Sequence, residues 1–389
     1  MSDRQYDLVL FGATGFTGGL TAEYLAANAP DGLRWALAGR SATKLESVRQ
    51  RLANIDPRLA DLPLVEADVT DEHSIEGLAK STKAIVTTVG PYALYGEPLV
   101  AACANAGTDY ADLCGEPEFV DNVWLKYDGA ARESGARLVH CCGFDSIPHD
   151  LGAYYTVLQL PENSPLRVEG FVKSGARFSG GTFYSALTGF SRARKTLKAA
   201  KARREQEPRP DGRKIGSWMR RIRRQPVAGG WVAPLPTIDP MIVLRSAASL
   251  DRYGPDFKYG HYMTARRLFT IIGLGALVAV LFVLAQIPPL RKLLLRFLSP
   301  GEGPSEELRA KSWFRVRFIG EGGGKRVVTE ISGGDPGYTE TAKMLAESGL
   351  ALVDSNGNDD SGQMTPVAAI GDALLERLPA AGIELRVID

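Results

Sequence analysis

The chain contains few of the residues that mark metal-binding or disulfide-stabilised proteins. Its 389 residues include four cysteines and four histidines. Cys103, Cys114, Cys141 and Cys142 lack the paired spacing of a zinc site, and the histidines are scattered along the chain. We therefore expect no metal site and no disulfide bond. The N-terminus also lacks a charged and then apolar signal region, which favours a reducing, cytoplasmic setting.

Two further absences exclude classes of function. No tyrosine is followed four positions later by lysine, so the Tyr-x-x-x-Lys pair of the short-chain dehydrogenases is missing, and no hydrolase nucleophile motif is present. The net charge is only +1, although the segment 192–224 contains fourteen Lys/Arg and three acidic residues. Trp218 is the one aromatic residue in that segment, and stacking on bases needs more. We expect no nucleic-acid partner.

Apolar runs and helical segments alternate through the first 150 residues. Strand-like segments such as "YDLVLF", "RWALAG" and "AIVTTVG" are separated by helical ones, as in 17–28, 42–53 and 98–106. Such alternation predicts right-handed βαβ crossovers and a parallel sheet covered on both faces. The sequence thus predicts an α/β fold with a doubly wound, Rossmann-like domain over 1–150.

The first turn of this domain has the pattern of a nucleotide-binding loop. "LVLFGATGFTGG" places Gly12, Gly15 and Gly18 between a strand and a helix, where glycines permit a tight turn and a close approach of backbone to a pyrophosphate. A helix N-terminus also favours negative charge. We expect the cofactor to be held here by Gly12, Thr14, Gly15, Phe16, Thr17 and Gly18.

The next strand ends indicate which nucleotide binds. After the second strand, Arg40 and Ser41 stand where NAD enzymes usually carry an acidic residue, and they suit a 2′-phosphate instead. NADP(H) is therefore the expected cofactor. Asp68 and Val69, after the third strand, are expected near the adenine. After the fourth strand, we expect contacts with the nicotinamide ribose from Thr88, Gly90 and Pro91.

Catalytic groups have no compact signature in this sequence. Tyr92 and Tyr95 follow the fourth strand, and their phenols are candidates for a site beside the nicotinamide. For each tyrosine, packing and hydrogen bonding within the loop is an equally good interpretation.

Long motifs in both halves of the chain resemble one family. "VTTVGPYALYGEPLVAACANAGTDYADLCGE", "CCGFDSIPHDLG" and "GYTETAKMLAESGLAL" are similar to segments of the saccharopine dehydrogenase-like oxidoreductases, and most of all of the trans-acting enoyl reductases of mycobacterial polyketide lipid synthesis. Cys114 and His149 depart from the family patterns, which have threonine and serine there. The resemblance implies an inserted α+β substrate lobe over 151–334 and C-terminal helices over 335–389 that return to the first domain.

The resemblance also directs attention to Asp145. It lies in "GFDSIPHDLG", where a buried strand is expected to end beside the nicotinamide. Its carboxylate either orients substrate or caps the helix that begins near Pro148. Asp145 is the third catalytic candidate, beside Tyr92 and Tyr95.

An apolar segment lies within the expected substrate lobe. Residues 268–285, "LFTIIGLGALVAVLFVLA", contain no charge and are long enough to span a bilayer, and basic residues flank them. We expect segment 266–298 to dip into a membrane surface from one side. A buried or dimer-interface helix is the second interpretation, and a true span is the third. This expectation places the protein in the cytoplasm, peripherally attached to the inner face of the plasma membrane.

Three functions remain open. The first is NADP(H)-dependent enoyl reduction of polyketide or fatty-acyl lipid intermediates, acting in trans. The second is oxidoreduction of a small substrate, which would need several arginines for its carboxylates, and Arg177 and Arg245 are the candidates. The third is a catalytically silent protein that binds nucleotide at a lipid surface. The basic segment 192–224 favours an acidic partner, either anionic lipid or an acyl carrier domain that delivers the substrate, and a homodimer is a further expectation.

Overall fold

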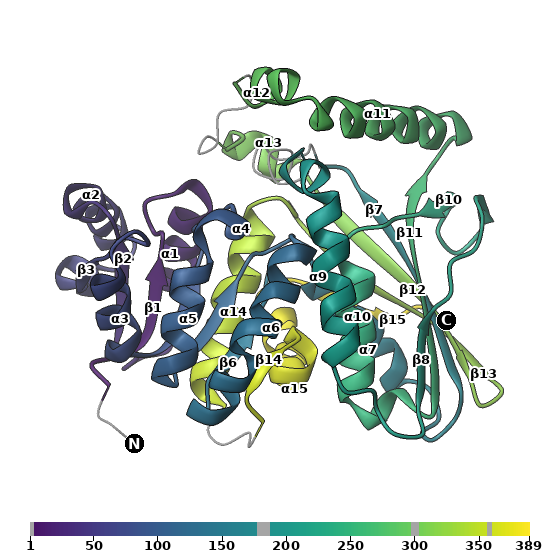
Figure 1. Cartoon of the computed structure of the whole chain (residues 1–389), viewed down its shortest axis with the longest axis horizontal. Helices are drawn as coiled ribbons and strands as arrows, with labels where there is room; N and C mark the ends of the chain where they lie inside the picture. Colours follow the sequence, from purple (N-terminus) through teal and green to yellow (C-terminus); the bar gives the residue numbers. More distant parts are fainter. Residues whose placement is uncertain (1–3, 177–186, 297–302, 356–359) are drawn as a thin grey trace. The chain divides into compact units, whose positions relative to one another are not determined.

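The computed structural model describes residues 4–176, 187–296, 303–355 and 360–389 (Figure 1). The chain divides into two compact units. Unit 1 comprises residues 1–143 and 338–374, and unit 2 comprises residues 144–337 and 375–389.

Unit 1 is built on a parallel sheet of seven strands in the order β14-β6-β5-β4-β1-β2-β3. The strands are β1 (Tyr6–Phe11), β2 (Trp35–Gly39), β3 (Leu64–Glu66), β4 (Thr82–Thr87), β5 (Asp109–Asp112), β6 (Arg137–Val139) and β14 (Gly362–Met364). All residues of β1 and β2 are buried, as expected for central strands with helices on both faces. The strand order reverses between β1 and β4, which is where ligands bind in open sheets of this kind. The predicted doubly wound sheet is confirmed.

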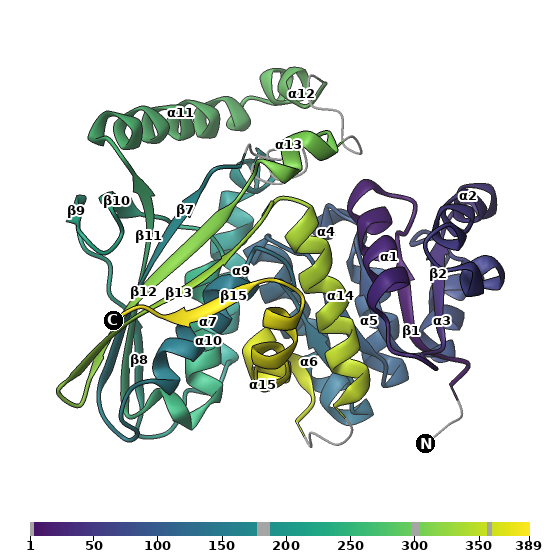
Figure 2. The ribbon, with the colours of Figure 1, turned by 180° about the vertical axis from the view of Figure 1, so that it is seen from behind.

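The helices of unit 1 follow the strands in the expected alternation. They are α1 (Phe16–Asn28), α2 (Ala42–Ala53), η1 (Pro57–Asp61), α3 (Glu72–Ser81), α4 (Tyr92–Tyr95), α5 (Glu97–Ala106), α6 (Pro117–Ser134) and α14 (Thr339–Asp354). α14 returns from far along the chain and packs on α1, β1 and β4 (Figure 2). A Cβ on Gly349 would lie 2.5 Å from Val86 Cγ1, so glycine is what allows this close packing.

Unit 2 contains an eight-stranded sheet in the order β15-β13-β12-β7-β11-β10-β9, with β8 paired to β11. Its strands are β7 (Leu166–Ser174), β8 (Lys214–Ser217), β9 (Arg223–Gln225), β10 (Gly230–Pro234), β11 (Asp256–Ala265), β12 (Phe314–Gly322), β13 (Lys325–Gly333) and β15 (Glu384–Val387). The C-terminal strand β15 pairs with β13, so the end of the chain joins this sheet rather than unit 1. The helix α15 (Pro366–Ala380) carries the chain from one unit to the other.

Helices pack on the sheet of unit 2 and also extend away from it. The described helices are α7 (Ile147–Leu158), α9 (Ala193–Gln206), α10 (Asp239–Ser249), η2 (Asp251–Tyr253), α11 (Leu268–Gln286), α12 (Pro288–Arg296) and α13 (Glu306–Ala310). α7 packs closely on β12, because a Cβ on Gly152 would lie 2.3 Å from a ring atom of Phe318. α11, by contrast, leaves the end of β11 and has only Ile271 and Ala285 buried among its nineteen residues.

Candidate functional site

The glycine loop after β1 is a tight, close-packed turn. Gly12 has φ +91°, a conformation that favours glycine, and its N–H donates to the carbonyl of Ala38 at 2.9 Å. A Cβ on Gly18 would lie 2.2 Å from the Gly12 carbonyl oxygen. Both glycines are therefore required by the backbone path from β1 into α1.

The N-terminus of α1 fits a phosphate group. Its N-cap is Gly15, which has no side chain to bond the first free N–H groups of the helix. Thr14 and Gly15 are exposed, while Phe16 and Thr17 are partly exposed. Uncapped N–H groups and the positive end of the helix dipole are what a pyrophosphate requires. The residues of this loop thus fit an NADP(H) pyrophosphate.

The ends of β2 and β3 place a cation near an acid. Arg40 is exposed, and the Ser41 hydroxyl accepts the Lys44 N–H at 3.4 Å as the N-cap of α2. Asp68 accepts hydrogen bonds from the Thr70 N–H at 2.9 Å and the Thr70 hydroxyl at 2.8 Å. These bonds, together with the charge of Arg40, lower the pKa of Asp68.

This arrangement suits the adenosine half of NADP(H). The guanidinium of Arg40 is available for a 2′-phosphate, since it forms no ion pair with any described residue. Val69, beside Asp68, is partly exposed and offers an apolar contact.

The end of β4 is joined to the glycine loop. The Thr88 hydroxyl donates to the Gly12 carbonyl at 3.1 Å, and the Thr88 N–H donates to the Phe11 carbonyl at 3.1 Å. The next residues include the exposed Gly90, which precedes Pro91 in a cis peptide. The predicted contacts after β4 and those after β1 therefore lie side by side, at the reversal of strand order.

The two candidate tyrosines differ in their environment. Tyr92 is buried, and its hydroxyl donates to the Thr87 carbonyl at 3.0 Å and accepts the Leu113 N–H at 3.1 Å. Burial raises its pKa well above the usual value. Tyr95 is 46% exposed. The geometry gives Tyr92 the role of holding the loop after β4 and leaves Tyr95 as the more accessible of the two candidate phenols.

A buried polar network supports this loop, and the sequence analysis did not identify it. Glu116 accepts the N–H groups of Tyr92 and Ala93, each at 3.0 Å. Asp112 accepts the N–H of Cys114 at 2.9 Å and lies 2.6 Å from His140 Nδ1. Both acids belong to the "DLCGE" motif, which follows a predicted strand and was the one signal available in the sequence.

In unit 2, Asp145 lies just before α7. It is partly exposed, and loss of hydration together with the nearby Asp239 carboxylate raises its pKa to about 7. A carboxyl group with this pKa exchanges a proton near neutral pH. Ser146, at the N-cap of α7, bonds the helix through its carbonyl, which accepts the N–H groups of His149 and Asp150.

Unit 2 also brings together histidines that the sequence separates. His149 Nε2 lies 3.6 Å from Asp239 Oδ1, and His261 Nε2 lies 3.5 Å from Asp239 Oδ2. All three residues are buried. Burial lowers the pKa of His149 to about 4, against the opposing effect of Asp239. The expectation that the scattered histidines form no cluster is therefore wrong for His149 and His261.

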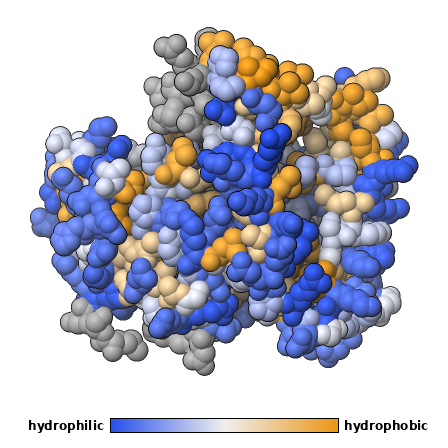
Figure 3. Space-filling view, viewed as in Figure 1, coloured by the Kyte–Doolittle hydropathy of each residue, from blue (hydrophilic) through white to orange (hydrophobic). Residues whose placement is uncertain are grey.

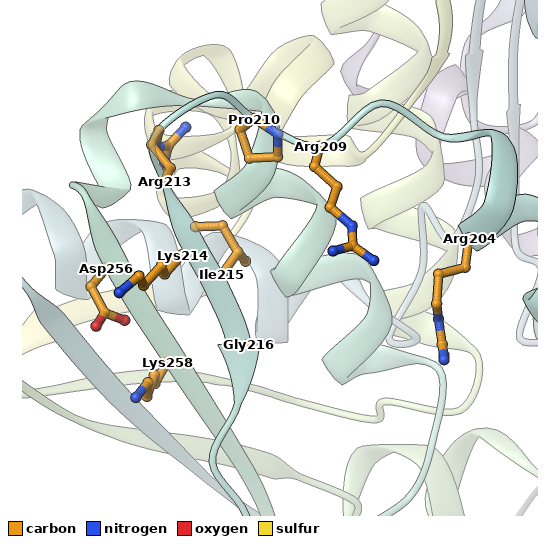
Figure 4. Close-up of a pocket in the computed structure, with 9 residues that line it drawn as sticks. All are labelled: Arg204, Arg209, Pro210, Arg213, Lys214, Ile215, Gly216, Asp256 and Lys258. Atoms are coloured by element: carbon orange, nitrogen blue, oxygen red, sulfur yellow. The ribbon is translucent and has the colours of Figure 1, made fainter.

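The basic segment forms part of a cationic pocket in unit 2 (Figure 4). The cavity has a volume of about 530 Å³, and its lining carries five cations and one acid: Arg204, Arg209, Arg213, Lys214, Lys258 and Asp256. Arg213 is structural, since its guanidinium donates to the carbonyls of Ala247, Ala248, Leu250 and Gly254. The other cations leave an anion-binding surface.

The arginines proposed for a small dicarboxylate substrate do not form a described site. Arg177 lies outside the described residues. Arg245 Nε lies 3.8 Å from Glu207 Oε1, which places Arg245 in an ion pair within unit 2.

Comparisons with known proteins relate both the nucleotide-binding part and the whole chain to other enzymes. Residues 8–139 match the family model described as the saccharopine dehydrogenase NADP binding domain. The chain is 39% identical over 421 residues to a Mycobacterium tuberculosis protein provisionally named a trans-acting enoyl reductase, covering 98% of this chain and 97% of the relative. It is 36% identical over 422 residues, with the same coverage, to the trans-acting enoyl reductase of Mycobacterium ulcerans.

One solved structure supports the fold. Saccharopine dehydrogenase (L-Glu forming) from Saccharomyces cerevisiae, in its apo form, covers 99% of this chain and 100% of its own with a TM-score of 0.57 at 11% identity. At this identity the likeness concerns the fold alone.

Proposed function

Because this chain belongs to the saccharopine dehydrogenase-like oxidoreductases, among the relatives named trans-acting enoyl reductases, it is an NADP-dependent oxidoreductase, and we propose that it reduces the double bond of a long-chain enoyl thioester. The observation that carries the choice of substrate is α11, a nineteen-residue apolar helix that is exposed along most of its length. A small polar substrate gives no reason for such a surface. A lipid substrate does.

Enoyl reduction with NADPH requires several tasks of the protein's residues. NADPH, when bound, supplies a hydride for the β-carbon of the enoyl thioester. The protein must hold the pyrophosphate at Gly12 to Gly18, deliver a proton to the α-carbon, and stabilise negative charge on the thioester oxygen. Tyr95 in unit 1 and Asp145 in unit 2 are the candidate proton donors. Tyr92 is assigned to positioning the loop, because both bonding positions of its hydroxyl are occupied.

The function is tested with the purified full-length chain and NADPH. We expect the absorbance of NADPH to fall with a long-chain trans-2-enoyl thioester, and to stay constant with glutamate plus aminoadipic semialdehyde. Oxidation with the second pair alone would contradict the proposal and favour the small-substrate alternative. Tight NADPH binding without turnover of any substrate would favour the catalytically silent alternative.

We propose in addition that α11 and α12 attach the protein to a membrane. One described helix, α11, is long and apolar enough to cross a bilayer. Its exposed side chains, each at least 53% exposed, include Phe269, Ile272, Leu277, Val280 and Val283. In Figure 3 hydrophobic colour gathers at the top of the view, where Figure 1 draws these two helices.

The connectivity of unit 2 favours attachment from one side over a single span. β11 precedes α11 and β12 follows α12, and both strands belong to the same sheet through β7. Both ends of the apolar segment must therefore lie on one side of a membrane. α12 has nine residues, about 14 Å of helix, which is too short to cross back. The last residues of the predicted segment 266–298, 297 and 298, lie outside the described residues.

The proposed location follows from this attachment. NADPH and thioester substrates are cytoplasmic, so we place the protein peripherally on the inner face of the plasma membrane. Fractionation of cells that express the chain tests this, since membrane-bound protein should be released by detergent, and recovery in the soluble fraction alone would contradict it.

We further propose that the basic segment 192–224 serves two acidic partners at two ends of the sheet. Arg224 pairs with Trp231, which pairs with Ala265 at the end of β11 that leads into α11. Lys214 pairs with Asp256 at the start of the same strand. The two ends of this ten-residue strand are roughly 30 Å apart.

Such a separation assigns a different partner to each end. Arg221 and Arg224, near α11, suit anionic lipid headgroups. The pocket lined by Arg204, Arg209 and Lys258 lies at the far end and suits an acidic acyl carrier domain. The names of the relatives describe enzymes that act in trans, which supports a separate partner that presents the substrate.

A further inference from the structure

The cluster of His149, Asp239 and His261 has the composition of a metal site. It offers two imidazole nitrogens and one carboxylate oxygen, and these ligand atoms all lie within 4.8 Å of one another. Imidazole with carboxylate is a donor set that suits zinc and similar divalent transition metals. The three residues come from three elements of unit 2: α7, α10 and β11.

The distances fit coordination better than hydrogen bonding. The two histidine–aspartate separations are 3.6 and 3.5 Å, longer than the usual range of N–H···O bonds. Ligand atoms that surround zinc as a tetrahedron, each about 2.0–2.2 Å from the ion, are themselves about 3.3–3.6 Å apart. The two observed separations end on different oxygens of Asp239, and the three ligand atoms all lie within 4.8 Å of one another, which leaves room for an ion between the side chains.

The cluster also contains polar atoms that lack partners. His261 Nε2 and Asp239 Oδ1 form no hydrogen bond with any described residue, although both side chains are at most 2% exposed. Buried polar atoms are normally paired. The other ring nitrogen of His261, Nδ1, lies 3.0 Å from the Tyr259 hydroxyl. A second hydrogen bond of this kind orients most metal-binding histidines and leaves Nε2 for the ion.

From this geometry we infer that unit 2 binds one divalent transition-metal ion, with zinc as the ion that fits best, through His149, Asp239 and His261. The ion links α7 and α10 to strand β11 and balances the buried carboxylate.

The test uses the full-length chain without a histidine tag. After equilibration with Zn²⁺ and dialysis against metal-free buffer, we expect about one zinc per chain by elemental analysis. His149→Ser and Asp239→Asn should each lower the zinc content at least about tenfold. Serine at position 149 also restores the family pattern, so this variant is expected to fold. His73→Ser, which removes an exposed histidine outside the cluster, should leave the zinc content unchanged.

Two measurements keep the inference open to refutation if a variant is unstable. NADPH binding reports the folding of unit 1, and Co²⁺ added to the native chain should give the visible absorption of a tetrahedral site, which Zn²⁺ then displaces. Zinc-free native protein after equilibration, no cobalt spectrum, or equal loss of zinc in His73→Ser would each overturn the inference.

Discussion

At the scale of single residues, we expect glycines and one arginine to determine how unit 1 binds its cofactor. Gly12 and Gly18 are fixed by sterics, because a side chain at either position would overlap the backbone or Thr88. Arg40 is different, because it is exposed, and we expect it to contact the ligand rather than to support the fold. A substitution of Arg40 should therefore change cofactor choice without changing stability.

Arg40→Asp should weaken NADPH binding by about 1.5–3 kcal/mol, because it removes a charge-assisted contact with the 2′-phosphate. This corresponds to roughly a 10- to 150-fold rise in Kd. NADH lacks the 2′-phosphate and serves as the matched control, so its Kd should not rise. Fluorescence titration of both nucleotides measures the effect. Equal affinity of the native chain for NADH and NADPH would show that the assignment of Arg40 and Ser41 is wrong.

Substitutions of the two tyrosines after β4 should have different effects, one on stability and the other on catalysis. Tyr92→Phe removes a buried hydroxyl that bonds Thr87 and Leu113, and we expect it to cost about 1–3 kcal/mol of unfolding free energy. Tyr95→Phe should leave stability within about 0.5 kcal/mol, because Tyr95 is exposed, and should lower kcat about 10²-fold or more by removing a proton donor.

Thermal unfolding and NADPH oxidation measure the two effects. An unchanged kcat in Tyr95→Phe would remove Tyr95 from the mechanism and leave Asp145 as the candidate donor.

At the scale of secondary-structure elements, α11 differs from every packed helix described above. α14 buries twelve of its sixteen residues, whereas α11 buries two of nineteen. Its contacts with the sheet are near its start, where Ile271 packs with Ala233 and Ala265. Near its end, Phe282 contacts the ring of Phe190, and the Gln286 side chain donates to the Phe190 carbonyl. A helix that is apolar on all sides and buries two of its nineteen residues gains little from the protein, so its hydrophobic stabilisation must come from another apolar phase.

Replacing Leu277, Val280 and Val283 with serine should release the protein from vesicles. The three side chains are 53–58% exposed, so the substitutions remove membrane contact without opening the core. Co-sedimentation with vesicles of neutral and anionic lipids measures binding, and the affinity for NADPH should stay constant.

The matched control replaces Ile55 and Leu197, exposed apolar residues outside α11, with serine. Equal sedimentation of the native chain and the α11 variant, or equal loss in the control, would contradict the membrane proposal.

At the scale of the whole molecule, the charge distribution decides how partners approach. The net charge is near zero although the segment 192–224 contains fourteen Lys and Arg residues. Some of these side chains stabilise the fold, and others are exposed at the surface. Arg203, Arg213 and Arg223 are held by Glu207, by backbone carbonyls and by Glu169. Among the exposed cations that remain, Arg224 and Lys214 lie at opposite ends of strand β11 in the sheet of unit 2.

Charge reversal at each end should therefore have a different effect. Arg204→Glu with Arg209→Glu should lower turnover of carrier-bound substrate about tenfold or more at low salt, and should leave turnover of a short soluble thioester unchanged. Arg221→Glu with Arg224→Glu should weaken binding to anionic vesicles, at about 1 kcal/mol per cation, without affecting the carrier-bound substrate.

Both effects should fade as added salt shortens the Debye length to below about 8 Å. If either pair of substitutions lowered both activities equally, the division of the segment into two docking surfaces would be wrong.

What the sequence determined by itself was the local, periodic part of the protein. The alternation of strands and helices, the glycine loop and the residues after β1, β2 and β4 follow from patterns within a few positions, and they predicted the parallel sheet and the NADP(H) cofactor. The predicted helix 42–53 matches α2 at both ends.

Only the tertiary structure decided which distant residues meet. Asp239 lies 90 positions after His149 and 22 before His261, and no periodicity relates them. Strand order and register also decide that the Tyr92 hydroxyl bonds Thr87 and Leu113. They decide as well that Arg224 and Lys214 lie at opposite ends of one sheet. These contacts join segments that are separate in the chain, and the packing of the core selects them, so no local pattern in the sequence can specify them.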